Sequence, residues 1–253
     1  MRASLSSKVV VMTIIFVTGS GRPAPGQTSH VFAVNLTQGS VPGSPIVVSA
    51  GQVKFTEKIY PDRVETSWAV HAQLLNASSK PILAFELSVH AVPDHGQAIA
   101  YVSQQDYFFK ENLAPVPGSQ FSLDVDDQIR GVLHLKASPS PGEARTPKAN
   151  LRVIFVEFAD GSNYGTSDWG KNLKEGRAAT VERMNELLQA YQSGGEGALR
   201  TTIARDLAAP DTPPYTVNAL RILDHVLSAD GVEGLALRIE EQLRVAQERL
   251  NVM

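Results

Sequence analysis

Six histidines are the residues of this chain best suited to acid–base or metal chemistry: His30, His71, His90, His95, His134 and His225. Histidine changes charge near neutral pH, and its neutral ring is a common metal ligand. None of the six lies in a His-x-x-x-His or His-Glu-x-x-His spacing, which would put two ligands on one helix face. A histidine site must therefore be built by strands that lie close together in the fold.

Two of these histidines, His71 and His90, lie in consecutive segments that alternate apolar and polar residues, as half-buried strands do. A hairpin that turns within residues 77–80 gives a register in which every apolar residue faces another. This register places His71 opposite Glu86, and Ser67 opposite His90, on the polar face. The apolar pairs that it predicts are Trp68–Val89, Val70–Leu87, Ala72–Phe85 and Leu74–Leu83.

The group of His71, Glu86 and His90 has three interpretations. A zinc site would need a third ligand that the register does not supply. A Ser–His–Glu hydrolase would need a nucleophile elbow and an oxyanion hole, and the sequence shows no motif for either. An ordinary solvent-facing cross-strand group needs nothing more. We expect the third, so the sequence assigns no catalytic, cofactor-binding or metal-binding residue.

Two oxygen-rich segments, Asp124 to Asp127 and Asp160 to Asn163, have the ligand type that calcium prefers. Neither has the twelve-residue spacing of an EF-hand loop. Strand alternation gives a simpler explanation of the first, with Leu123 and Val125 pointing inward and Asp124 and Asp126 pointing outward.

Aromatic residues could form a carbohydrate- or peptide-binding platform, but most such residues are core. Trp68 shares the parity of its apolar strand neighbours, so we expect it in the core. Residues 107–109 (Tyr-Phe-Phe) lie among charged neighbours, which predicts that at least one of them faces outward. We interpret Tyr164 and Trp169 as the seam between the two parts of the chain.

The N-terminal segment has the three parts of a secretory signal peptide: a basic start, the short apolar run 9–17 and a small-residue end. Residues 1–26 are the predicted signal peptide, with cleavage after Gly26 or, alternatively, after Gly21. The chain has no cysteine, which excludes disulfides and thiol chemistry. We therefore expect an exported protein, periplasmic or secreted, that relies on its apolar core.

Residues 27–165 are predicted to form an antiparallel, immunoglobulin-like β-sandwich, because short alternating runs are separated by Gly, Pro, Asn and Asp. The run from Leu151 to Phe158 is apolar on both faces and is expected to be central. The Ser/Pro-rich stretch 137–150 is expected to be a mobile loop. The other expected strands are 31–36, 52–60, 98–103, 120–125 and 129–135.

Residues 166–253 form an all-helical region, because the apolar period changes to three and four residues. Gly194-Gly195 is predicted to break the first helix, and Pro210 to end the second. A capping box at Asp230 to Glu233 is predicted to open the last helix. Each helix has one apolar stripe and must bury it against another element.

One part of the chain, residues 74–122, resembles exported bacterial immunoglobulin-like modules of the F-x-L-Y-D type. The residues that carry the resemblance are Asn76-x-Ser78-x-Lys80-Pro81-Ile82, Phe85-Glu86-Leu87, the turn at Gly96, and Pro117-Gly118 leading to Phe121. Ser88 and Val89 stand where the family has Tyr and Asp. The resemblance implies a fold and an accessory or binding role outside the cytoplasm, and no functional residue.

The charge balance, 23 basic and 26 acidic residues, shows no basic excess that would indicate nucleic acid or anionic lipid as a partner. We expect a non-enzymatic binding or assembly module whose partner is a protein or an envelope component, with no cofactor. The alternative is an exported hydrolase with its site at the seam between sandwich and helices. A third hypothesis is strand addition at an open edge of the sandwich.

Overall fold

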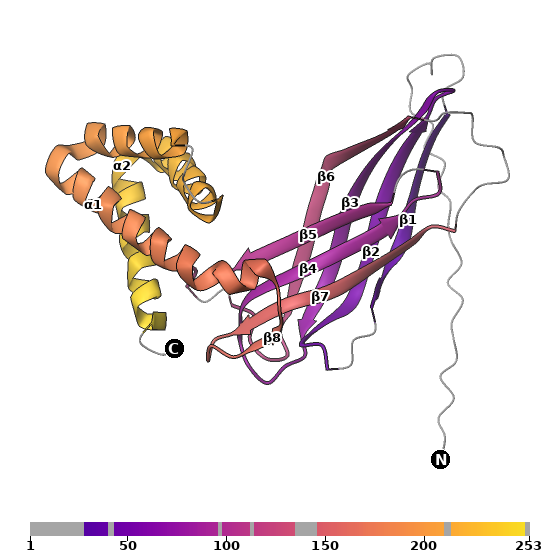
Figure 1. The fold of residues 1–253 in the computed structure, drawn as a ribbon, viewed down its shortest axis with the longest axis horizontal. Helices are drawn as coiled ribbons and strands as arrows, with labels where there is room; N and C mark the ends of the chain where they lie inside the picture. Colours follow the sequence, from indigo (N-terminus) through magenta and orange to yellow (C-terminus); the bar gives the residue numbers. More distant parts are fainter. Residues whose placement is uncertain are drawn as a thin grey trace.

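The computed structural model describes residues 28–39, 43–95, 98–111, 114–134, 146–209 and 214–250. The predicted signal peptide and most of the predicted mobile loop lie outside these residues. The side chains of 126–134, 214–216 and 218–219 are also outside the description. Within the described residues, eight strands precede two long helices (Figure 1).

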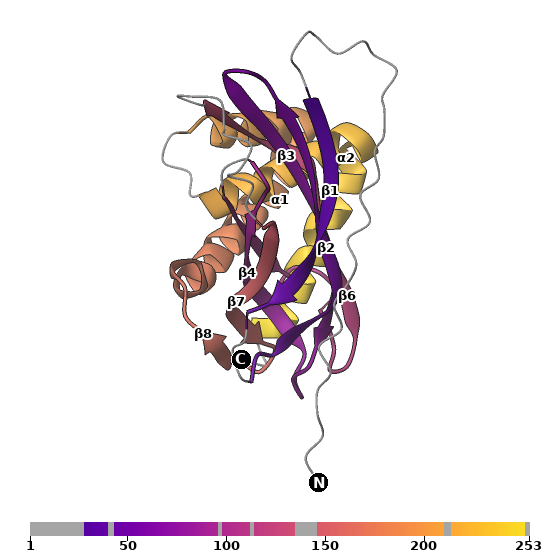
Figure 2. The same ribbon diagram turned by 90° about the vertical axis from the view of Figure 1, so that its right-hand side faces the viewer.

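The strands form one curved sheet in the order β5-β4-β7-β1-β2-β3-β6, with the short β8 beside β7. The sheet bends into a half-barrel, and the helices lie beyond one end of it (Figures 1 and 2). As expected, β7 is central. The strands are β1 (Thr28–Gln38), β2 (Ile46–Ile59), β3 (Arg63–Asn76), β4 (Ile82–Val92), β5 (Ile99–Asp106), β6 (Gln120–His134), β7 (Lys148–Phe158) and β8 (Asn163–Gly165).

The sheet is mixed, which corrects the prediction of a purely antiparallel fold. β1 and β7 pair in parallel from Leu36↔Ala149 to Gln38↔Leu151. This pair joins the two antiparallel groups into a single sheet, so two separate sheets of a sandwich are not what the structure shows. Strand alternation predicts which residues point inward, but it does not reveal that one pair runs parallel.

The predicted hairpin of β3 and β4 is wrong. β3 pairs with β2 on one side and with β6 on the other, while β4 pairs with β5 and β7. The residue parity was right for Val70 and Leu87, which are both fully buried in the same core cluster. It was wrong for Leu83, which packs with Phe108 and Ala246 in a separate cluster, next to a register shift between Ile82 and Ala84. β3 and β4 face the same core from different parts of the curved sheet. The alternation of apolar residues is the same for two strands that pair and for two strands that pack across a core, so it could not distinguish these cases.

The main core fills the concave side of the half-barrel. Trp68 is buried there, as expected, and its ring meets the edge of Tyr101 from β5 with centroids 5.4 Å apart. Phe85 of β4 and Phe121 of β6 approach to 5.5 Å between ring centroids. The two ends of the sheet therefore both contribute to one continuous cluster, although β5 and β6 do not pair.

Two turns that carry the family resemblance meet in the structure. The fully buried Asn76 side chain donates to the carbonyls of Lys80 (2.8 Å) and Pro115 (2.9 Å). The Gly118 N–H donates to the Asn76 carbonyl at 2.9 Å. These bonds fix the path by which the chain leaves β3 for β4. Membership of the F-x-L-Y-D family stays a prediction.

The helical region consists of α1 (Asp168–Ala208) and α2 (Pro214–Leu250). Ser167 caps α1, its hydroxyl accepting from the Gly170 N–H at 2.9 Å. The predicted break at Gly194-Gly195 is confirmed, since Gly195 has φ 65°. A second interruption occurs at Gly231, φ 75°, within the predicted capping box. Neither helix has, in its described part, a stretch apolar enough to cross a bilayer.

The helices bury their apolar stripes against one another and against the sheet. Met184, Leu199 and Leu235 belong to a cluster shared by α1 and α2. The start of α1 packs on the convex side of β4 and β7, where Trp169 meets the ring of Phe155 at 6.2 Å. A Cβ on Gly170 would lie 2.7 Å from that ring, so the small residue allows this close approach.

Candidate functional site

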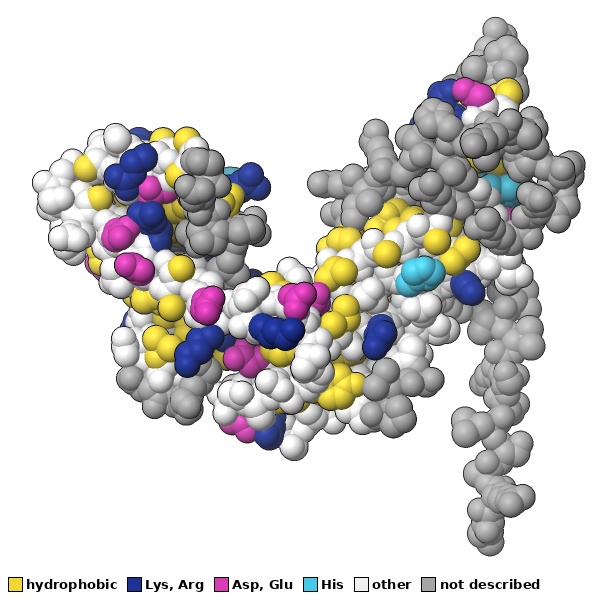
Figure 3. Space-filling model, in the orientation of Figure 1, with side chains coloured by type: hydrophobic (Ala, Val, Ile, Leu, Met, Phe, Trp, Pro, Cys, Tyr) yellow, Lys and Arg dark blue, Asp and Glu magenta, His cyan; other side chains and the backbone are white. Residues whose placement is uncertain are grey.

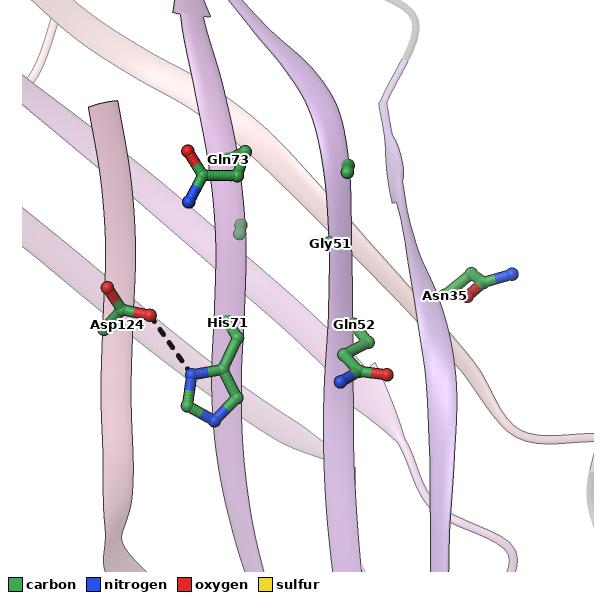
Figure 4. Close-up of a pocket in the computed structure, with 8 residues that line it drawn as sticks. Asn35, Gly51, Gln52, His71, Gln73 and Asp124 are labelled. Carbon is green, nitrogen blue, oxygen red and sulfur yellow. Dashed lines mark hydrogen bonds and ion pairs between the residues drawn. The ribbon is translucent and has the colours of Figure 1, made fainter. Parts of the chain in front are cut away.

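The convex face of the sheet carries a polar row across four strands: Asn35, Gln52, His71 and Asp124 (Figure 4). His71 Nδ1 lies 3.1 Å from Asp124 Oδ1, and both side chains are about half exposed. The hydrogen bond from His71 lowers the pKa of Asp124 below its ordinary value. Both side chains are exposed to solvent, so the pair is an ordinary cross-strand group of the kind that the sequence suggested. The partner of His71 is Asp124 and not the predicted Glu86.

The residues predicted to accompany His71 lie elsewhere. Glu86 is on β4, opposite Gln104 and Phe155, and only 8% of it is exposed. Its Oε2 has no hydrogen-bond partner among the described residues. His90 is exposed on the same strand. The prediction that Glu86 faces solvent opposite His71 is therefore wrong, since it followed from the hairpin that does not form.

The two oxygen-rich segments make ion pairs rather than a cation cage in the part of the chain that is described. Lys80 Nζ lies 2.7 Å from Asp160 Oδ2, and the Ser162 hydroxyl donates to Asp160 Oδ1 at 2.6 Å. The hydrogen bond from Lys80, with those from Ser162, lowers the pKa of Asp160 to about 2. Among the described residues no three His, Asp or Glu gather as metal ligands do; the Asp126 and Asp127 side chains lie outside them.

A buried carboxylate that the sequence analysis did not single out lies on the concave side of β2. Glu57 is fully buried and accepts from the His95 backbone N–H at 3.1 Å. Its other oxygen is 3.2 Å from His95 Nδ1, and the rings of His95 and His30 stack at 6.2 Å. The group holds the turn after β4 against β2, which is a structural role.

The aromatic run after β5 is more buried than predicted. Phe108 is fully buried, and Tyr107 and Phe109 are half-buried. Burial raises the pKa of Tyr107. Arg249, near the end of α2, donates to the carbonyls of Tyr107 and Lys110. The run therefore receives the C-terminal helix instead of presenting an outward platform.

Arg177 of α1 is the most enclosed charge of the seam, only 3% exposed. Its Nε and Nη2 each donate to Asp106 at 3.0 Å, and Nη2 also donates to Glu157 at 2.6 Å. Asp106 and Glu157 flank Ala84 in the pairing of β5, β4 and β7. Burial by itself lowers the pKa of Arg177, but the bonds and charges of Asp106 and Glu157 outweigh it, and the pKa is raised.

Beside this ion-pair group lies a pocket of about 490 Å³ between α1 and the sheet. Arg177 forms part of its wall, with its guanidinium carbon 4.6 Å from the centre of the Phe108 ring. Figure 3 shows hydrophobic side chains gathered in the angle between α1 and the end of α2, with charged groups around them. The lining residues are Phe108, Glu157, Gly161, Lys174, Arg177, Ala178, Val181, Glu182 and Leu250.

The seam itself was predicted from Tyr164 and Trp169, and Trp169 does lie in it. Tyr164 instead packs against the main core. The pocket was missed, although the sequence holds one signal for it. Arg177 lies four residues before Val181 and seven before Met184, on the apolar stripe of α1. A charge on such a stripe indicates a buried partner.

Comparison with known protein families, with curated proteins and with solved structures found no match to this chain.

Proposed function

We propose that this protein is an exported, non-enzymatic binding module whose ligand site is the pocket between α1 and the sheet. The ligand is a small, mainly apolar molecule. The observation that carries the proposal is the pocket's combination of size and lining. Its volume, about 490 Å³, falls within the range of small-molecule sites.

The lining supports a ligand with an apolar body. Phe108, Ala178, Val181 and Leu250 provide apolar surface, and Leu250 is 47% exposed, which is high for a leucine in a helix. Burial of such surface by a ligand is favourable by roughly 25 cal/mol per Å². Lys174 and Glu182 are exposed on α1 and can meet a polar group of the ligand at the rim.

The same lining favours binding over hydrolysis. A hydrolase site needs a nucleophile within hydrogen-bond reach of a base, and donors for the developing oxyanion. The described lining offers two carboxylates, a lysine and an arginine, but no histidine or hydroxyl side chain. Arg177 and Glu157 are in addition bound to each other. The seam was the place where we expected a hydrolase site, so the binding module is the better-supported of the two functions.

Fluorescence titration with the apolar anionic dye anilinonaphthalene sulfonate tests the proposal. Ala178→Trp places a large ring at the pocket wall, whereas Ala204→Trp places the same ring on an exposed part of α1 away from it. We expect saturable dye binding to the folded wild-type protein and to Ala204→Trp, and its loss in Ala178→Trp. Equal binding by all three proteins, or none by the wild type, would show that the pocket is not a ligand site.

A further inference from the structure

β5 is an edge strand of the described sheet, and only its last residue, Asp106, is charged. Within the described sheet it pairs with β4 alone. Natural sheets shield such edges with charges, prolines or bulges. Residues 99–105 (Ile-Ala-Tyr-Val-Ser-Gln-Gln) contain no charge and no proline, and their register with β4 has no bulge. Among the described residues, this edge is therefore available to another strand.

The opposite edge of the sheet is different. β6 carries the charged Asp124, whose side chain is exposed, and its register with β3 shifts between Trp68 and Val70. Charges and irregular pairing are the protections that β5 lacks. The difference singles out β5 as the edge suited to strand pairing.

The exposed side chains of β5 point to the same use. Val102 stands in the middle of the uncharged stretch on the convex face and is 47% exposed. On the concave face Tyr101 is only half-buried, although it packs against the main core. Figure 3 shows hydrophobic side chains along the rim of the sheet where β5 lies in Figure 1. A strand added here would cover both.

We propose that the occupant of this edge is a second copy of the chain, with two β5 strands pairing antiparallel about a twofold axis at Val102. The uncharged stretch extends three residues to each side of Val102, so Ile99 faces Gln105, Ala100 faces Gln104, and Tyr101 faces Ser103 of the other copy. No charge opposes a like charge. A twofold contact of this kind is self-complementary, as homodimer interfaces are.

The absence of cysteine from the chain gives a direct test of this register. In Val102→Cys the two introduced thiols lie opposite each other across the axis, within the range that mild oxidation can join. In Ala100→Cys, on the same strand and face, they lie about 13 Å apart, since each residue advances a strand by about 3.3 Å. We expect a disulfide-linked dimer from Val102→Cys and none from Ala100→Cys.

The mass of the protein in solution provides the second measurement. Light scattering after size exclusion should give twice the chain mass for the wild type over the micromolar range. Val102→Lys puts two like charges at the axis and should give a monomer. Val116→Lys, a change at another exposed valine, should remain a dimer. A monomeric wild type would overturn the proposal, and so would equal cross-linking of the two cysteine variants.

Discussion

Arg177 of α1 donates hydrogen bonds to both carboxylate oxygens of Asp106 on β5, each at 3.0 Å. The bidentate geometry fixes the angle at which the helix meets the sheet. Glu157 of β7 binds the same guanidinium, so one side chain connects α1 to two strands.

Removal of this cation should destabilise the protein. Arg177→Met leaves two carboxylates of like charge enclosed at the seam, and breaking a buried ion pair costs about 3–5 kcal/mol. Arg177→Lys should recover only part of this, because an ammonium cannot reproduce the planar fork. Urea unfolding measures the change. The triple variant Arg177→Met, Asp106→Asn, Glu157→Gln is the control and should be more stable than Arg177→Met alone.

The Lys80–Asp160 pair should contribute to stability in a pH-dependent way. The pKa of folded Asp160 is about 2, below its ordinary value of 3.8. The contribution is therefore present above the ordinary value and is lost as the pH falls toward 2. Lys80→Met should raise the pKa of Asp160, which NMR titration of its carboxyl group would show. An unchanged pKa would mean that Lys80 is not the cause.

The core and the convex face should respond very differently to truncation. Leu87 is fully buried, and Leu87→Ala should lower the free energy of unfolding by about 2–5 kcal/mol. His71→Ala should cost well under that, because exposed cross-strand pairs contribute roughly 0.2–1 kcal/mol. Thermal or chemical unfolding of the two variants compares them. If His71→Ala unfolded the protein and Leu87→Ala had no effect, the buried and the exposed faces would have been assigned the wrong way round.

The helical region should resist proteolysis as a packed unit. Its seam with the sheet includes the Trp169–Phe155 contact. Limited proteolysis of the wild type should cut first within 137–147, before β7, or within 210–213, before α2. Trp169→Ala removes the ring that packs on Phe155 and should make residues after 166 more susceptible. Rapid loss of the helices from the wild-type protein would contradict their packing on the sheet.

The mature protein should begin near Gln27 and be recovered outside the cytoplasm. The expectation rests on the basic start, apolar run and small-residue end of residues 1–26. N-terminal sequencing of protein purified from its native source measures the start. An intact Met1 on that protein would contradict export.

Much of the fold could be read from residue parity, but the pairing of strands could not. Alternation correctly placed Trp68 and Leu87 in the core, because a half-buried strand must point its apolar residues one way. It could not show that β3 lies between β2 and β6, since strands beside each other and strands across a core share the same parity. The mistaken pairing placed Glu86 opposite His71, whereas Glu86 lies opposite Gln104 and Phe155.

The helices were predicted more closely, because their signals are local. Gly195 interrupts α1 where the glycine pair indicated a break. The pocket depends on residues far apart in the chain, from Phe108 to Leu250, and only the position of Arg177 on an apolar stripe pointed to it. Sites assembled by long-range packing leave little trace in sequence periodicity.

The parallel contact of β1 with β7 constrains the order in which this protein can fold. Thr37 donates to the carbonyl of Ala149, a residue 112 positions later. Until residues 148–158 are in place, β4 and β5 have no link by strand pairing to β1, β2, β3 and β6 in the described sheet. Both pieces then present their core-facing side chains to water. Non-local pairing of this kind is slow and exposes the chain to aggregation. The core is therefore completed only when β7 joins the two groups of strands.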